Sequence, residues 1–296
     1  MEGAAAIAGH FGLSPLLIGL TVISIGTSAP EILVSANAAI NQSSGLAVGN
    51  ALGSNLANIG LVLAITALIC PLTVRRSMAR SEIPIMLGVT LLAGIVLINS
   101  YLGRWESVFL LLCLIVFLLY LTQQAKKGSA PSSVNLDVEI PDKPLKSATF
   151  STIIGLIALI LSSRLLVWSA SEMASQFGVS DLVIGITVVA VGTSLPELAA
   201  SLAGALKGHS EMAIGNILGS NIFNLLAVLP IAGVIYPTQI EGTSFVRDFG
   251  TVFALSALLA AACIWKTRHQ QTGQLGRPLG AAMLLLYVGY YFWLLL

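Results

Sequence analysis

The sequence predicts an all-α polytopic membrane protein made of two related halves that cross the membrane in opposite directions. Of its 296 residues, 56% are apolar and only 9% are charged, whereas a soluble domain carries about 25% charged residues. The apolar residues fall into nine runs, each near the ~20 residues that a helix needs to cross a bilayer. A 48-residue pattern also occurs twice, 166 residues apart.

The nine apolar runs are the candidate membrane spans, and one polar segment separates them into two groups. We expect the spans at residues 13–40, 45–70, 82–100, 104–122, 149–173, 180–206, 211–236, 246–266 and 278–296. The segment 123–147 is rich in Ser, Pro and charged residues, which is typical of an exposed linker. The chain is therefore expected to consist of a first half (1–122), a linker (123–147) and a second half (148–296).

The repeated pattern indicates an internal duplication. Residues 11–58 align with residues 177–224 without a gap, and 24 of these 48 positions are identical. The same offset places the counterpart of span 149–173 mostly before Met1. We therefore expect ten spans, five in each repeat, with nine present here and the first largely missing. A start codon assigned too late is the explanation that we favour over loss of a helix.

The basic residues predict the orientation. If the largely missing span is counted first, eleven basic residues fall in connections on one side: Arg75, Arg76, Arg80, Lys126, Lys127, Lys143, Lys146, Lys207, Lys266, Arg268 and Arg277. The other side has only Arg104 and Arg247. The positive-inside rule makes the first side cytoplasmic, which puts the linker inside the cell and the C-terminus outside. Because each repeat has an odd number of spans, the two repeats are inverted, as in many transporters.

Most acidic residues fall in connections or near span ends, but two lie well inside candidate spans, at equivalent positions of the two copies: Glu31 and Glu197. A carboxylate in a membrane helix is costly and usually faces a partner or a polar cavity. Each follows a Gly-Thr-Ser-x-Pro sequence, in which proline cannot donate a hydrogen bond to the carbonyl four residues earlier. The repeated sequence therefore predicts a broken helix that offers carbonyls around residues 24–26, hydroxyls and a carboxylate.

The following span adds polar side chains at a spacing of four residues. Asn50, Ser54 and Asn58 are expected on one helix face, and Asn216, Ser220 and Asn224 repeat them. Glycines at GxxxG spacing in the same span favour close helix packing. Carboxylate, amide, hydroxyl and carbonyl oxygens suit calcium or sodium rather than zinc or copper. Two carboxylates balance one divalent ion, two monovalent ions or two protons, and competition between such ions is a physical basis for antiport.

At these residues the sequence resembles the calcium/cation antiporter superfamily, whose repeats carry GTS-x-PE and GN-x-x-GSN-x-x-N patterns. It is similar to the prokaryotic sodium/calcium exchanger branch. The resemblance implies a ten-helix exchanger fold, alternating access and calcium export driven by sodium entry. It also implies ion ligands: the carboxylates of Glu31 and Glu197, side-chain oxygens of Asn58, Asn224, Thr27, Thr193, Ser28, Ser194, Ser54 and Ser220, and backbone carbonyls near Ser24 and Ala190. Some family members have Asp at the position of Asn224, so the number of sodium ions per calcium stays open.

The leading hypothesis is a sodium/calcium antiporter in the plasma (inner) membrane, and a calcium/proton antiporter is the alternative. The expected binding partners of the protein are Ca²⁺ together with Na⁺ or H⁺, and the lipid bilayer. We expect no cofactor and no obligate protein partner, and a net charge of +1 gives no general attraction for nucleic acid. The three histidines lie near span ends, away from Ser28 and Ser194, which disfavours a Ser–His enzyme.

Overall fold

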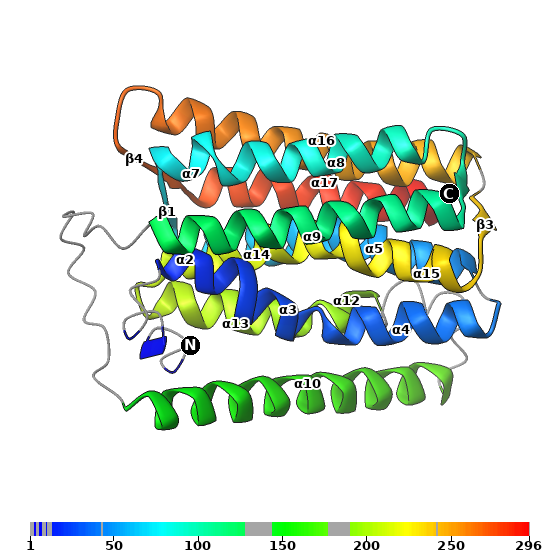
Figure 1. The fold of residues 1–296 in the computed structure, drawn as a ribbon, viewed down its shortest axis with the longest axis horizontal. Helices are drawn as coiled ribbons and strands as arrows, with labels where there is room; N and C mark the ends of the chain where they lie inside the picture. The colour runs from blue at the N-terminus through cyan, green and yellow to red at the C-terminus, as the bar shows by residue number, and fades with distance from the viewer. Residues whose placement is uncertain are drawn as a thin grey trace.

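Long apolar helices run side by side along one axis in the computed structural model of this protein (Figure 1). The structure describes residues 14–42, 44–127, 144–176, 190–240 and 242–295, together with Gly3, Ala6, Ile7 and His10. Within these ranges, six helices are long and apolar enough to cross a membrane, or seven if one bent pair counts as a single span.

The first half begins with the bent pair. Ser14 caps the first helix, its hydroxyl accepting the Leu17 N–H at 3.3 Å, and Pro15 occupies the first turn, where a missing N–H costs nothing. The elements of this half, in chain order, are α2 (Pro15–Ile18), η1 (Gly19–Ile23), α3 (Ser24–Thr27), α4 (Ala29–Ile40), α5 (Ser44–Ala57), η2 (Asn58–Leu63), α6 (Ala64–Ile69), β1 (Leu72–Arg75), α7 (Arg76–Arg80), α8 (Glu82–Val96), β2 (Tyr101–Leu102) and α9 (Arg104–Lys127).

The second half repeats much of this order. Its elements are α10 (Leu145–Gln176), α12 (Ala190–Thr193), α13 (Leu195–Leu206), α14 (Ser210–Phe223), η4 (Asn224–Val228), α15 (Leu229–Ile235), β3 (Thr238–Gln239), α16 (Gly242–Thr267), β4 (Thr272–Leu275) and α17 (Arg277–Leu295). Residues 180–189 of the predicted span 180–206 lie outside the described residues. Helix α9 continues to Lys127 and α10 starts at Leu145, so both helices extend a few residues into the segment expected to be a linker.

Within the described residues, four short strands join helices of the otherwise all-α bundle. β1 pairs with β4 in antiparallel register, Leu72 opposite Leu275, and β2 pairs with β3, Leu102 opposite Thr238. β1 and β4 lie at one end of the bundle, and β3 lies at the other (Figure 1). Each strand is only two to four residues long. They pair because chain leaving a helix has free backbone N–H and C=O groups that need partners.

The core of the bundle is the continuous helix formed by α14, η4 and α15. Its side chains are buried along nearly its whole length, and α5 with η2 and α6 forms the second buried helix. Outer helices such as α9 and α10 instead expose large apolar side chains, among them Phe109, Ile115 and Phe150. A buried centre and an apolar exterior are what a bundle in lipid requires.

Candidate ion-binding site

The two predicted carboxylates lie at matching breaks in two helices. Glu31 is in the first turn of α4 and Glu197 in the first turn of α13, and each is only 1% exposed. The helix axis bends by 42° between Pro15–Thr27 and Ala29–Ile40. Pro30 supplies no N–H to the turn before it, so the helix restarts there. The N-terminal end of each new helix carries a partial positive charge that favours a nearby carboxylate.

An asparagine from the next helix holds each break in place. The Asn50 amide donates to the Glu31 carbonyl at 3.0 Å and to Ser35 Oγ at 2.9 Å. The Ser35 hydroxyl in turn donates to the Ala47 carbonyl at 3.0 Å. These bonds connect the first turns of α4 to α5. Both hydrogen bonds of the Asn50 amide nitrogen therefore go to the helix that carries Glu31.

The second copy makes the same bonds at an offset of 166 residues. The Asn216 amide donates to the Glu197 carbonyl at 3.4 Å and to Ser201 Oγ at 3.0 Å. The Ser201 hydroxyl lies 3.5 Å from the Ala213 carbonyl. Identical sequence in the two copies therefore gives the same local network twice, and each network fixes the backbone that carries a buried glutamate.

The two breaks meet each other inside the bundle. The Ser28 hydroxyl donates to Glu197 Oε1 at 3.2 Å, and the Thr27 hydroxyl donates to Asn216 Oδ1 at 3.2 Å. Ser220 adds a second, longer contact to Glu197 Oε1 at 3.4 Å. Residues up to 189 positions apart in sequence therefore form one polar centre.

Several predicted ligand oxygens in the described part of the chain are buried without a hydrogen-bond partner. They are both carboxylate oxygens of Glu31, Oε2 of Glu197, the hydroxyls of Ser54 and Ser194, and the amide oxygens of Asn58 and Asn224. Leaving one such group unpaired costs about 1–3 kcal/mol, and a charged group costs more. Carboxylate, hydroxyl and amide oxygens of this kind are the ligand types that suit a hard cation.

Wider helical turns position the two asparagines of this set. Asn58 starts the π-helical segment η2, and Asn224 starts η4. Such turns are rare and occur often at functional sites because they disturb the regular pattern of backbone bonds. Gly60 lies within η2, whereas η4 contains neither glycine nor proline, so no shared sequence signal predicted both turns.

The carbonyl ligands implied by the resemblance have different environments. The Ser24 carbonyl already accepts the Ser28 N–H at 2.9 Å and is 3.4 Å from the Thr27 hydroxyl, so only part of its acceptor capacity is available. Ala190 is the first residue of α12 and directly follows the undescribed residues 177–189. Thr193, at the end of α12, is 7% exposed.

Two further buried amides were absent from the predicted ligand set. Neither amide atom of Asn55 has a partner among the described residues, and the same holds for Oδ1 of Asn221. The Asn221 nitrogen donates to the Ile217 carbonyl at 3.0 Å. Both belong to the Gly-Ser-Asn triplets that the two copies share, and this identity was the signal that could have revealed them.

An apolar helical bundle that encloses two carboxylates and a set of neutral oxygens defines a membrane transporter of cations. The chain matches the family described as sodium/calcium exchanger protein over residues 1–123 and 147–296, and it belongs to that family. It is therefore a membrane antiporter of the calcium/cation exchange class and not an enzyme.

Individual relatives are similar over nearly the whole chain. The putative antiporter CaxA of Alkalimonas amylolytica is 42% identical over 291 residues, covering 97% of this chain and 90% of that protein. The inner membrane protein YrbG of Escherichia coli K12 is 39% identical over 289 residues, covering 96% and 86%. A solved structure of the sodium-calcium exchanger NCX_Mj superposes with a TM-score of 0.81 at 35% identity, covering 97% of this chain and 89% of that one.

Proposed function

We propose that this protein exchanges calcium for sodium across the membrane by alternating access. The carrying observation is the pair of buried carboxylates, Glu31 and Glu197, in matched broken helices of a chain that also buries several neutral oxygens without a partner among the described residues. Two negative charges compensate one calcium ion, and the surrounding oxygens replace its water. Sodium ions compete for the same oxygens, so one cation must leave before the other can bind.

The proposed ligands fall into two groups by what they contribute. Glu31 and Glu197 supply the charge. Neutral oxygens come from the side chains of Asn58, Asn224, Ser54, Ser220, Thr27, Thr193, Ser28 and Ser194 and from the carbonyls of Ser24 and Ala190. Ser28 and Ser220 already contact Glu197 Oε1, and these hydroxyls can turn their oxygen atoms toward a cation when one is present.

We propose an architecture of two inverted repeats with nine spans, split by the linker 123–147. The two small sheets support it. Thr238 of β3 follows Leu72 of β1 by 166 residues, yet β1 and β3 lie at opposite ends of the bundle (Figure 1). Equivalent segments at opposite ends are what an inverted pair of repeats requires.

The proposed location is the plasma (inner) membrane, with the basic end and the linker in the cytoplasm and the C-terminus outside. In Figure 1 the β1–β4 end lies opposite the C-terminus. All four tryptophans of the chain are well exposed, at 59–84%: Trp105, Trp168, Trp265 and Trp293. Exposed tryptophans near helix ends are typical of membrane–water interfaces.

Calcium flux into vesicles tests the proposal. Vesicles containing the protein and loaded with sodium should take up calcium when placed in sodium-free buffer. Glu31→Gln and Glu197→Gln should each lower the rate at least tenfold, because one of the two charges opposite the divalent ion is removed. Glu106→Gln, at the start of α9 and outside the site, is the matched control and should retain the rate.

The same vesicles decide the coupling ion. Uptake that follows an imposed proton gradient and ignores a sodium gradient would overturn sodium coupling and would favour calcium/proton exchange. If either site variant exchanged calcium as fast as the unmodified protein, the assignment of the carboxylates would be wrong.

A further inference from the structure

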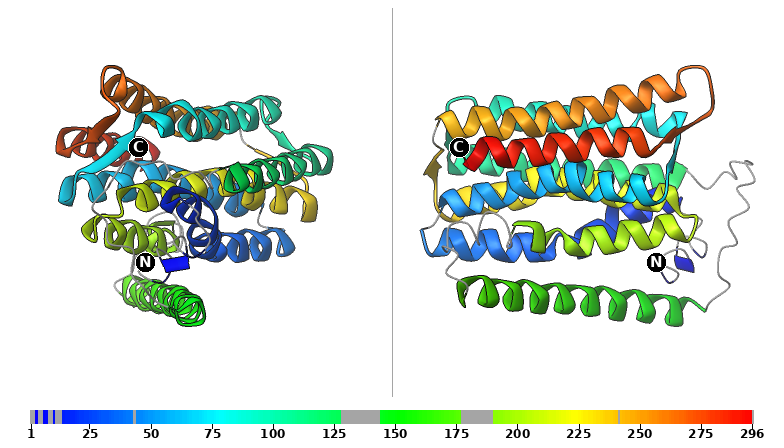
Figure 2. Two further views of the ribbon diagram at one scale, coloured as in Figure 1. Left: turned by 60° about the vertical axis from the view of Figure 1, so that its left-hand side comes forward. Right: turned by 180° about the vertical axis from the view of Figure 1, so that it is seen from behind.

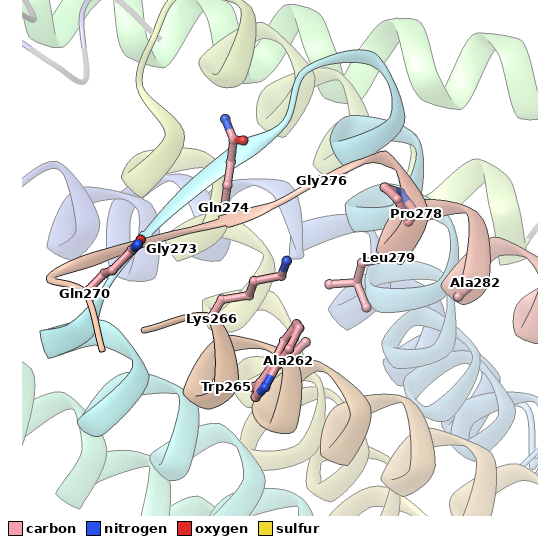
Figure 3. A pocket seen from close by; sticks show the side chains of 10 residues that line it. All are labelled: Ala262, Trp265, Lys266, Gln270, Gly273, Gln274, Gly276, Pro278, Leu279 and Ala282. Atoms are coloured by element: carbon pink, nitrogen blue, oxygen red, sulfur yellow. The ribbon is translucent and has the colours of Figure 1, made fainter. Parts of the chain in front are cut away.

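A groove between the end of α16 and the start of α17 contains a feature that ion exchange does not use. Its volume is about 640 Å³ (Figure 3), and it lies beside β4 at the β1–β4 end of the bundle (Figure 1). The lining combines apolar groups with a cation and amides. It includes Ala262, Trp265 and Lys266 from α16, Gln274 from β4, and Leu279 and Ala282 from α17.

The returning strand β4 forms one wall of this groove. A side chain at Gly273 would place its Cβ 2.8 Å from the Cβ of Lys266 and 3.0 Å from its carbonyl oxygen. Glycine is therefore needed for β4 to pass so close to the end of α16. The strand is held by its pairing with β1, and the turn before it by the bond from the Arg76 N–H to the Gln271 carbonyl at 2.8 Å.

Basic residues lie in the chain on both sides of the groove. Lys266, Arg268 and Arg277 are all basic, and the acidic Glu211 at the same end of the bundle is paired with Arg75 of β1. The Lys266 ammonium lies 4.8 Å from the centre of the Trp265 ring, and no ion pair to it occurs within the described ranges. Trp265 is 69% exposed, as expected for a side chain at the level of lipid headgroups.

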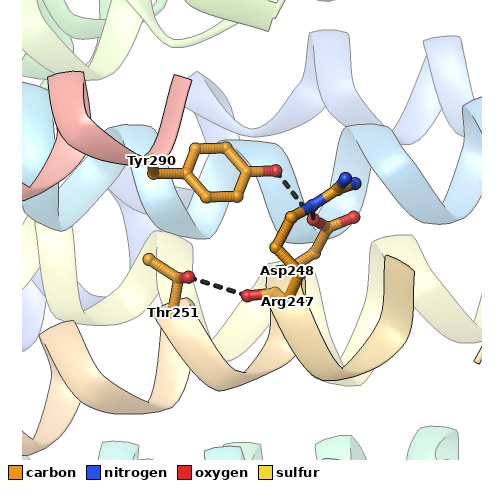
Figure 4. A network of polar contacts seen from close by, with 4 residues as sticks. All are labelled: Arg247, Asp248, Thr251 and Tyr290. Carbon is orange, nitrogen blue, oxygen red and sulfur yellow. Dashed lines mark hydrogen bonds and ion pairs between the residues drawn. The ribbon is translucent and has the colours of Figure 1, made fainter. Parts of the chain in front are cut away.

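The opposite end of the same two helices provides an internal comparison. A groove of about 500 Å³ there also contains a basic residue, Arg247. Its guanidinium is paired with Asp248 at 2.7 Å, and Asp248 also accepts the Tyr290 hydroxyl at 3.0 Å (Figure 4). The cation at that end is therefore neutralised by protein, whereas Lys266 remains available to an anion from outside.

We propose that the groove at Lys266 binds a phospholipid with an anionic headgroup. The phosphate lies at the Lys266 ammonium, with Gln270 as a neutral hydrogen-bond donor at the rim. An acyl chain runs along the apolar wall formed by Ala262, Leu279 and Ala282. Basic residues at a membrane surface attract anionic lipid, and the groove adds a defined place for the chain. This lipid site depends on the protein lying in a membrane, and it does not depend on whether sodium or protons drive the exchange.

Native mass spectrometry of the full-length purified protein tests this site. The protein in detergent is titrated with phosphatidylglycerol or with phosphatidylcholine of the same acyl chains. Phosphatidylglycerol should bind several-fold more tightly. Lys266→Gln should weaken that binding about fivefold, which corresponds to about 1 kcal/mol for one basic residue at the surface, while Lys266→Arg should retain most of it.

A matched variant distinguishes lipid binding in the groove from a general effect of positive charge on lipid binding. Lys146 is exposed at the start of α10, on the opposite side of the bundle from α16 (Figure 2). Lys146→Gln removes the same charge and should leave phosphatidylglycerol binding unchanged. Ala282→Trp fills the apolar wall and should weaken binding of both lipids. Equal binding of the two lipids, or equal losses in Lys266→Gln and Lys146→Gln, would overturn the proposal.

Discussion

Replacing Asn50 with leucine removes the bonds that fix the break carrying Glu31. Its amide donates to the Glu31 carbonyl at 3.0 Å and to Ser35 Oγ at 2.9 Å, and the side chain is 7% exposed. A hydrogen bond of this kind contributes about 1 kcal/mol in a folded protein and about 0.6 kcal/mol on average between membrane helices. Losing both should lower the free energy of unfolding by about 1–2 kcal/mol.

Thermal unfolding in detergent measures this loss. About 1–2 kcal/mol should lower the melting temperature by roughly 2–8 °C in a protein of this size. Asn55→Leu is the matched control, because Asn55 lies five residues later on the same helix and its amide has no partner among the described residues. That substitution removes no bond and should shift the melting temperature little, or raise it.

A double-mutant cycle measures the interaction energy between Asn50 and Ser35. Asn50→Leu and Ser35→Ala should together cost less than the sum of the two single changes, by about 0.6–1 kcal/mol. The reasoning is refuted if Asn50→Leu melts at the temperature of the unmodified protein, or if Asn55→Leu is destabilised equally. Asn216→Leu repeats the test in the second half, where the corresponding bonds are 3.4 and 3.0 Å long.

Two further stability predictions follow from close contacts. Gly219→Ala should lower the free energy of unfolding by about 1–3 kcal/mol through overpacking, because the new Cβ would lie 2.5 Å from Ser24 Oγ and 2.8 Å from the Leu20 carbonyl oxygen. Gly88→Ala is the control, because its new Cβ meets no described atom within 4 Å, and it should be neutral or stabilising. Similar losses in the two variants would contradict the packing argument. Tyr290→Phe should lower the free energy of unfolding by about 1 kcal/mol, because it removes the 3.0 Å hydrogen bond from the Tyr290 hydroxyl to Asp248. The loss should appear as a lower melting temperature, and an unchanged melting temperature would show that this bond contributes nothing.

Local sequence predicted much of the candidate site. A Gly-Thr-Ser-x-Pro-Glu stretch specifies a helix break by its own chemistry, and Glu31 and Glu197 lie at such breaks. The exact repetition of the pattern predicted equivalent surroundings for the two carboxylates. The hydrogen bonds of Asn50 and Asn216 agree with that equivalence.

Contacts between packed helices could not be predicted in the same way. The sequence placed Asn50 and Ser54 on one helix face. Only the packing of the helices decides that the Asn50 amide donates to the Glu31 carbonyl while the Ser54 hydroxyl has no partner among the described residues. The π-helical turns at Asn58 and Asn224 also depend on packing, because no residue at those positions breaks a helix by itself.

The sequence alone determined the apolar helical character, the duplication and the identity of the two buried acids, because periodicity and proline chemistry act over a few neighbouring residues. The tertiary structure decided which polar groups are bonded and which are left for a cation. It brought Ser28 to Glu197 across 169 residues and paired β1 with β4 beside the Lys266 groove. Such contacts depend on how helices distant in sequence pack together, and no local pattern encodes that arrangement.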